Sequence, residues 1–134
     1  MTPPLLDTHV WVWWLLGDPR LSDGDRHVLD GLPRGGRPML CDISLWEVAL
    51  LVQLGRLELT VPLESWLAVA AAATTVRVLP ITPAVVAEMN RLPKAFHQDP
   101  ADRLIVATAR VHDLPLATHD GRILDSDLIT RWRA

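Results

Sequence analysis

The sequence predicts an α/β fold with a central, largely parallel sheet covered by helices on both faces. Short apolar runs typical of strands alternate with longer segments of helical pattern, and parallel strands need such crossovers because a tight hairpin cannot join them. Asp7 ends the first of these runs, and Asp120 comes two positions after the run at 114–118. The 134 residues and 49% hydrophobic content are enough for one core, so we expect a single domain over residues 1–134.

Breakers and periodicity place the elements in order. We expect strands at 4–7, 39–41, 76–81 and 114–118, and helices at 8–17, 44–54, 63–75, 82–91 and 101–112. No element is assigned to the polar stretch 22–30, and 33–38 is rich in loop formers. The last residues, 127–132, could add an edge strand.

Composition excludes several classes of protein. Cys41 is the only cysteine, so neither an intrachain disulfide nor a structural zinc site with two or four cysteines is possible. The N-terminus lacks the features of a secretory signal, and charges or prolines interrupt every apolar run, so we expect a cytoplasmic protein with no membrane segment. With 16 acids against 13 bases, any nucleic-acid substrate needs a local phosphate-binding feature.

Two aspartates follow predicted strands, where open parallel sheets place their binding crevice. Asp7 could simply cap the next helix, which on its own is the better explanation. Asp120 could belong only to an Asp-Gly turn after a strand end.

Two predicted helix starts carry further acids. Ser44 and Glu47 match an S-x-x-E capping box, although Glu47 sits among large apolar residues where a lone charge is costly. Asp99 and Asp102 match an N-cap and an N3 acid around Pro100, with both carboxylates on one face of the first turn.

One explanation covers four of these acids, namely convergence on a divalent cation by Asp7, Glu47, Asp102 and Asp120. Mg²⁺ prefers hard oxygen ligands, whereas the five histidines show no zinc-ligand spacing. Such a cation can polarise a phosphodiester, activate an attacking water and stabilise the leaving oxygen. An acidic cluster without a cation would repel a phosphate.

Four segments in this order resemble the PIN-domain family, especially the VapC-type ribonuclease toxins of bacterial toxin–antitoxin pairs. They are LLDTHVWVWWL at 5–15, ISLWEVALLVQLGRL at 43–57, HQDPADRLIVATA at 97–109 and LPLATHD at 114–120. The resemblance runs nearly end to end and implies a three-layer α/β/α sandwich, Mg²⁺ dependence with Mn²⁺ as a substitute, endonucleolytic cleavage of RNA, a homodimer, and inhibition by a VapB-type antitoxin.

The resemblance also implies residue roles. Asp7, Glu47 and Asp102 would be the core acidic triad, Asp120 the fourth acid, and Asp99 a nearby helper. The chain departs from many relatives at Cys41-Asp42, where a further carboxylate precedes the serine-containing helix and leaves the exact ligand set open.

Other polar residues near these segments have weaker assignments. Arg103 could contact a phosphate, although a structural ion pair is favoured. Ser44 and Thr118 could orient a ligand or a metal-bound water, with capping and strand-end packing as equal alternatives. His97 and His119 are interpreted as incidental, because a metal-activated water needs no histidine.

Three closely spaced tryptophans, Trp11, Trp13 and Trp14, cannot all face one core. Core packing is the default for each, and the remainder could face a dimer partner, an antitoxin or stacked RNA bases.

The expected activity is hydrolysis of RNA by a metal-activated water at the acidic cluster. Two alternatives stay open: a catalytically inactive PIN-like module that only binds a partner, and a nuclease of the same fold acting on other nucleic acid. An aspartyl-phosphate phosphatase is excluded, because the D-x-D pair it needs would require an acid where His9 stands.

Overall fold

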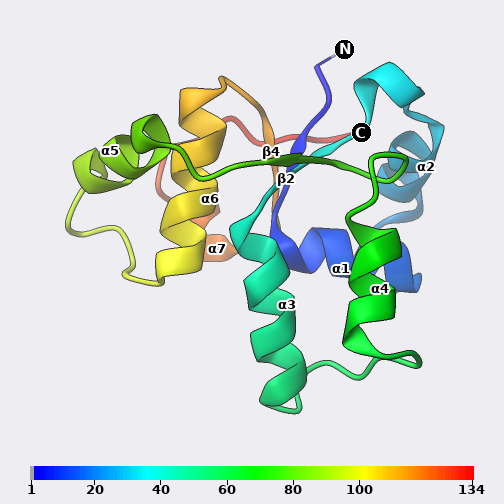
Figure 1. The fold of residues 1–134 in the computed structure, drawn as a ribbon. Coiled ribbons are helices and arrows are strands. Elements are labelled where there is room, and N and C mark those ends of the chain that lie inside the picture. The colour runs from blue at the N-terminus through cyan, green and yellow to red at the C-terminus, as the bar shows by residue number, and fades with distance from the viewer. Residues whose placement is uncertain (1) are drawn as a thin grey trace.

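A four-stranded parallel sheet forms the centre of the molecule, in a computed structural model that describes residues 2–134 (Figure 1). The strands are β1 (Leu5–Leu6), β2 (Met39–Cys41), β3 (Arg77–Leu79) and β4 (Leu116–Ala117), in the spatial order β3-β2-β1-β4. Each neighbouring pair is parallel, as predicted. The expected edge strand at 127–132 is reduced to a single parallel bridge between Leu116 and Arg131.

Within residues 2–134, seven α-helices and one 3-10 turn connect and cover the strands. They are α1 (Thr8–Leu16), α2 (Asp23–Gly31), η1 (Arg34–Gly36), α3 (Ile43–Gln53), α4 (Leu63–Ala70), α5 (Pro83–Arg91), α6 (Pro100–Val111) and α7 (Gly121–Leu124). No helix among residues 2–134 is both long and apolar enough to cross a membrane.

The helices α2 and α7 were not predicted. The Ser22 hydroxyl caps α2 by accepting the Asp25 N–H at 3.1 Å, a signal that the polar composition of 22–30 hid. The helix α7 is a single turn that starts at Gly121, with Asp120 at its N-cap position. The predicted helix 63–75 is wrong in its second half, because α4 ends at Ala70 and the chain then turns into β3.

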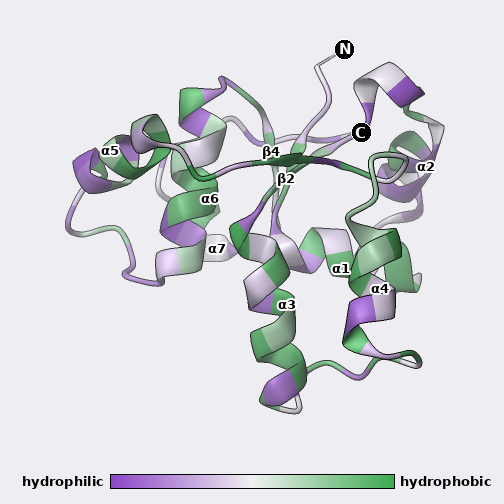
Figure 2. Cartoon of the chain, viewed as in Figure 1, coloured by the Kyte–Doolittle hydropathy of each residue, from purple (hydrophilic) through white to green (hydrophobic). Residues whose placement is uncertain are grey.

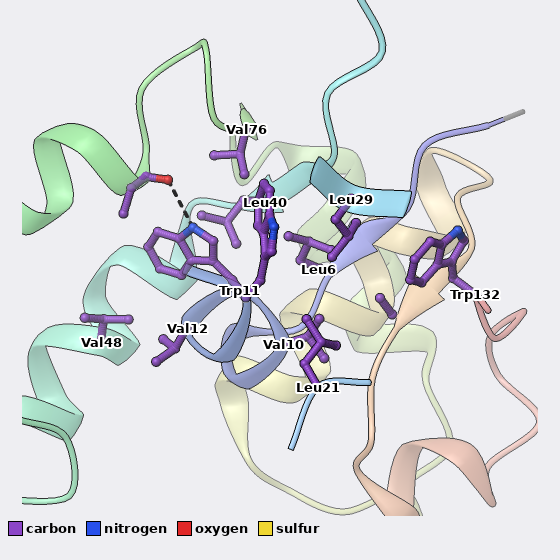
Figure 3. Packing of buried hydrophobic residues seen from close by; sticks show 13 residues of the cluster. Leu6, Val10, Trp11, Val12, Leu21, Leu29, Leu40, Val48, Val76 and Trp132 are labelled. Atoms are coloured by element: carbon purple, nitrogen blue, oxygen red, sulfur yellow. Dashed lines mark hydrogen bonds between the residues drawn. The ribbon is translucent and has the colours of Figure 1, made fainter. Parts of the chain in front are cut away.

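Successive strand residues point to opposite faces of the sheet and build two cores. On one face Leu6, Leu40 and Ala117 pack with α1, α2 and α4 (Figure 3). On the other face Leu5 and Leu116 pack mainly with α6. These two cores confirm the expected three-layer α/β/α sandwich.

Trp11 anchors the first of these cores. Its side chain is fully buried and its indole N–H donates to the Ala70 carbonyl at 3.0 Å (Figure 3). Its ring centroid lies 5.2 Å from that of Trp66 on α4. Trp14 is buried in the same core, whereas Trp13 is only half-buried. Trp13 nevertheless packs against this same core, so the prediction that the three tryptophans could not all face one core is wrong; Trp13 is the one of the three that also reaches the surface.

The carboxyl ends of β1, β2 and β4 lie at one edge of the sheet because these strands are parallel. The helices α1, α3 and α7 begin at that edge, and α6 begins beside it (Figure 1). Residues at these helix starts are consequently brought together from distant parts of the chain.

Candidate active site

Acidic side chains from four parts of the chain meet at this edge. Ligand oxygens of Glu47, Asp99 and Asp102 all lie within 4.8 Å of one another. Ligand atoms of His97, Asp102 and Asp120 form a second group within the same limit. Asp102, in the first turn of α6, belongs to both groups and is the centre of the cluster.

Asp7 lies at the buried side of the cluster, with only 4% of its surface exposed. It occupies the N-cap position of α1 but its side chain makes no capping hydrogen bond, so the capping explanation for Asp7 is wrong. Its Oδ2 instead accepts a hydrogen bond from the Thr118 hydroxyl at 2.7 Å. Burial raises the pKa of Asp7 above its ordinary value, and the nearby Asp120 charge adds to that rise.

Glu47 is held by Thr8, a residue to which the sequence motifs assign no role. Thr8, directly after Asp7, donates its hydroxyl proton to Glu47 Oε1. The Ser44 hydroxyl lies 2.8 Å from that of Thr8, and since the single Thr8 proton goes to Glu47, Ser44 must be the donor to Thr8. Burial raises the pKa of Glu47. The chain Ser44 to Thr8 to Glu47 therefore fixes this carboxylate.

The capping box expected at Ser44 and Glu47 is not formed. The helix α3 begins one residue earlier, at Ile43, with Asp42 at the N-cap position and without a capping side chain. Both side chains of the sequence motif are thus free to enter the cluster. Thr8 could have been suspected of a role in this site because it follows Asp7 at the end of the first strand.

Asp99 and Asp102 keep the local roles that their spacing predicts. Asp99 Oδ1 accepts the N–H groups of Ala101 at 2.9 Å and Asp102 at 3.2 Å, and Pro100 stands at the first helical position. Burial, together with the charges of Asp7 and Asp99, raises the pKa of Asp102 to about 8. Capping by Asp99 therefore holds Asp102 in place within the cluster.

Asp120 also combines a local and a shared role. Its Oδ1 caps α7 by accepting the N–H groups of Arg122 at 2.9 Å and Ile123 at 3.3 Å. The Thr118 hydroxyl, which donates to Asp7, accepts the Asp120 N–H at 3.0 Å. Thr118 thus links two acids that are 113 positions apart in the sequence.

His97 was interpreted as incidental, but it lies against the cluster. Its Nε2 is 3.2 Å from Asp102 Oδ2, and both side chains are largely buried. Neither ring nitrogen has an aligned hydrogen-bond partner among residues 2–134. His97 comes from the loop before α6, and only the fold reveals that this loop folds over Asp102.

Two other polar residues are directed away from the cluster. Asp42 Oδ2 accepts the Ile81 N–H at 3.2 Å and joins neither acidic group within the described chain. Arg103 donates to backbone carbonyls between Leu92 and His97, including that of Phe96 at 3.1 Å, and its guanidinium lies 5.7 Å from the Phe96 ring. The ion pair favoured for Arg103 is absent among residues 2–134, and a phosphate contact would require this network to open.

The cluster suits a hard divalent cation. Oxygen ligands around one Mg²⁺ lie at most about 4.2 Å apart, given metal–oxygen distances of about 2.1 Å, so groups within 4.8 Å need only a slight contraction. Burial raises the pKa values of Asp7, Glu47 and Asp102, and the charges of neighbouring acids add to that rise, so their ionised forms are poorly stabilised here. A cation at this edge would stabilise them.

Comparisons with known proteins agree with this geometry. The family profile described as "PIN domain" matches residues 5–127. The chain is 40% identical to "Ribonuclease VapC22" of Mycobacterium tuberculosis over 123 residues, which are 92% of this chain and 91% of that protein.

Solved structures also share the fold. One is FitAcB from Neisseria gonorrhoeae, with a TM-score of 0.66, 26% identity and 96% of each chain covered. Another is VapBC2 from Rickettsia felis bound to a DNA fragment from its promoter, with a TM-score of 0.70, 16% identity and 96% of each chain covered. With the profile matching nearly the whole chain and the acids gathered at one edge of the sheet, this protein belongs to the PIN-domain family.

Proposed function

We propose that this chain is a metal-dependent endoribonuclease and the toxin component of a VapBC-type toxin–antitoxin system, acting in the cytoplasm. The observation that carries the proposal is the gathering of Glu47, Asp99, Asp102 and Asp120 beside the buried Asp7. The relative named as a ribonuclease supports RNA as the substrate. The proposed cation is Mg²⁺, with Mn²⁺ as a substitute.

In the proposed mechanism Asp7, Glu47, Asp102 and Asp120 hold the cation. When bound, the cation supplies Lewis-acid chemistry, which activates an attacking water and stabilises the leaving oxygen of a phosphodiester. Thr118 orients the Asp7 carboxylate, while Thr8 and Ser44 orient Glu47. Asp99 fixes the first turn of α6 and with it Asp102.

An apolar surface supports the proposal of a VapB-type antitoxin as partner. Leu16, Val61 and Val69 are exposed, the last by 71%, and together with Trp66 they line a groove of about 500 Å³ beside α4. Much of α3 and α4 is hydrophobic where these helices project beyond the sheet (Figure 2). An exposed apolar groove of this kind suits a nonpolar segment of a protein partner. We also propose a homodimer, which light scattering of the purified chain would test.

The test is incubation of the purified chain with single-stranded and structured RNA, with Mg²⁺, Mn²⁺ or EDTA. We expect cleavage that needs the cation and falls by at least about a hundredfold in Asp7→Asn and Asp102→Asn, because each removes a charged ligand. Glu58→Gln is the matched control, since Glu58 is an exposed acid outside the cluster. RNA left intact under every condition would favour a partner-binding module without activity.

Matched DNA substrates decide between the two nuclease hypotheses. The cation chemistry on a phosphodiester does not itself require the 2′-OH, so selectivity must come from substrate binding. We expect cleavage of RNA and not of the DNA of the same sequence. Equal cleavage of both would replace the ribonuclease proposal by a nuclease of broader specificity.

A further inference from the structure

Four planar side chains are in contact on the surface next to the acidic cluster. Trp13 lies at their centre, with the ring centroids of His119 and His9 at 5.5 Å and 6.0 Å from its own. The guanidinium carbon of Arg20 lies 4.8 Å from the Trp13 ring. Trp13 is half-buried, whereas His9, Arg20 and His119 are exposed. We call these four residues the stacking surface.

The stacking surface begins where the acidic cluster ends. His9 is two residues beyond Asp7, and His119 directly precedes Asp120. His9 and Trp13 are four residues apart on α1 and therefore lie on the same side of that helix. A nucleotide adjoining a phosphate at the cluster would lie next to these side chains.

Arg20 is fixed in its position by Asp18. Its Nη2 lies 2.7 Å from Asp18 Oδ2, its Nε donates to Asp18 Oδ1 at 3.1 Å, and its backbone N–H donates to the same oxygen at 2.9 Å. This bidentate pairing fixes the guanidinium plane above the indole. It also offsets the positive charge of Arg20, so Arg20 contributes chiefly as a flat surface for stacking.

We propose that the stacking surface binds an unpaired base of single-stranded RNA next to the phosphate that is cut. Proteins recognise unpaired bases by stacking them on aromatic or histidine rings and on arginine planes, which are the groups present here. This inference rests on the proposed function and names the form of its substrate. Trp13 acts as a positioning residue that holds the three exposed groups together.

The composition of the stacking surface favours RNA over a protein partner. Its exposed groups are two imidazoles and a guanidinium, all with polar edges that suit the edges and faces of a base. Three exposed aliphatic residues, Leu16, Val61 and Val69, lie in the separate groove beside α4. A nonpolar segment of a protein would bury more apolar area in that groove than on the stacking surface.

The test measures binding of a fluorescein-labelled single-stranded oligoribonucleotide by anisotropy. The measurement is made in EDTA, because cleavage is expected to need the cation, and the wild-type affinity is compared with those of Arg20→Ala, Arg20→Lys and Trp13→Leu. We expect about tenfold weaker binding for each, with Arg20→Lys no better than Arg20→Ala because lysine keeps the charge and loses the plane. Arg91→Ala is the control, since it removes an exposed arginine on α5.

A set of strands with one abasic position each identifies the stacked base. One position should weaken wild-type binding about tenfold and should have little further effect in Arg20→Ala, since both changes remove the same contact. Equal RNA binding by the wild type and both Arg20 variants overturns the inference. The same holds if the Arg20 variants bind RNA normally and lose affinity only for a peptide from a VapB-type antitoxin. Failure of the wild-type chain to cut any RNA overturns the proposed function instead, and the binding measurement still decides the stacking surface.

Discussion

At the residue scale, Thr8 is the side chain whose role the fold adds to the acidic motif. It joins α1 to α3 by donating to Glu47 and accepting from Ser44. We expect Thr8→Val to lower the cleavage rate about 10- to 100-fold, because valine keeps the shape and removes both hydrogen bonds. Thr60→Val is a control for the same substitution at an exposed site. Unchanged cleavage by Thr8→Val would show that Glu47 needs no such support.

Asp102 gives the chain a pH-dependent stability. Its pKa rises from 3.8 to about 8 in the folded chain, so the unfolded chain loses this proton first as the pH increases. The resulting loss of stability is absent below about pH 4, grows as the pH rises, and is complete above about pH 8. Without divalent cations, the free energy of unfolding should therefore decrease over this interval.

The substitution Asp102→Asn removes that loss. We expect it to raise the free energy of unfolding at pH 8 by on the order of 2 kcal/mol in EDTA, while abolishing RNA cleavage. Urea unfolding at pH 5 and pH 8 measures the effect, which should be larger at pH 8. A variant that is less stable than the wild type at pH 8 would contradict the buried, uncompensated charge assigned to Asp102.

At the element scale, substitutions of Asp99 distinguish its capping of α6 from a contribution of its charge to cation binding. Asn caps helices as well as Asp does, whereas Ala does not. We expect Asp99→Ala to cost about 1 kcal/mol of stability and Asp99→Asn close to none, as measured by thermal unfolding in EDTA. If Asp99→Asn nevertheless weakens Mn²⁺ binding in calorimetry, Asp99 contributes its charge to the site. Equal stability of the two variants would contradict the capping role.

The elements that were predicted are those with strong local signals. Apolar runs and breakers give all four strands, and the N-cap aspartate and proline give the start of α6. The helix α2 was missed because most of its residues are polar and only Leu29 among them is fully buried. His97 and Thr8 were missed because their roles depend on which loop covers α6 and which helix lies beside α1, and sequence spacing carries no such information.

At the scale of the whole molecule, the acidic cluster is the place where separate parts of the sandwich meet. Asp7 follows β1, Glu47 belongs to α3, Asp102 to α6, and Asp120 follows β4. The two hydrophobic cores hold the layers together from opposite faces of the sheet. Repulsion among the acids opposes this packing at the carboxyl edge. A cation there would join four elements that are remote in the sequence.

Cation binding should consequently stabilise the entire fold. At a free Mn²⁺ concentration of about 100 times the dissociation constant, linkage predicts a gain of about 2.7 kcal/mol, which corresponds to a rise of roughly 5–15 °C in the melting temperature. Glu47→Gln should reduce this gain by removing a charged ligand, whereas Glu58→Gln should preserve it. Hydrogen exchange should show added protection at the starts of both α3 and α6. Protection confined to α6 would mean that the cation is held by Asp99, Asp102 and Asp120 without Glu47, and that the sandwich is not joined across its carboxyl edge.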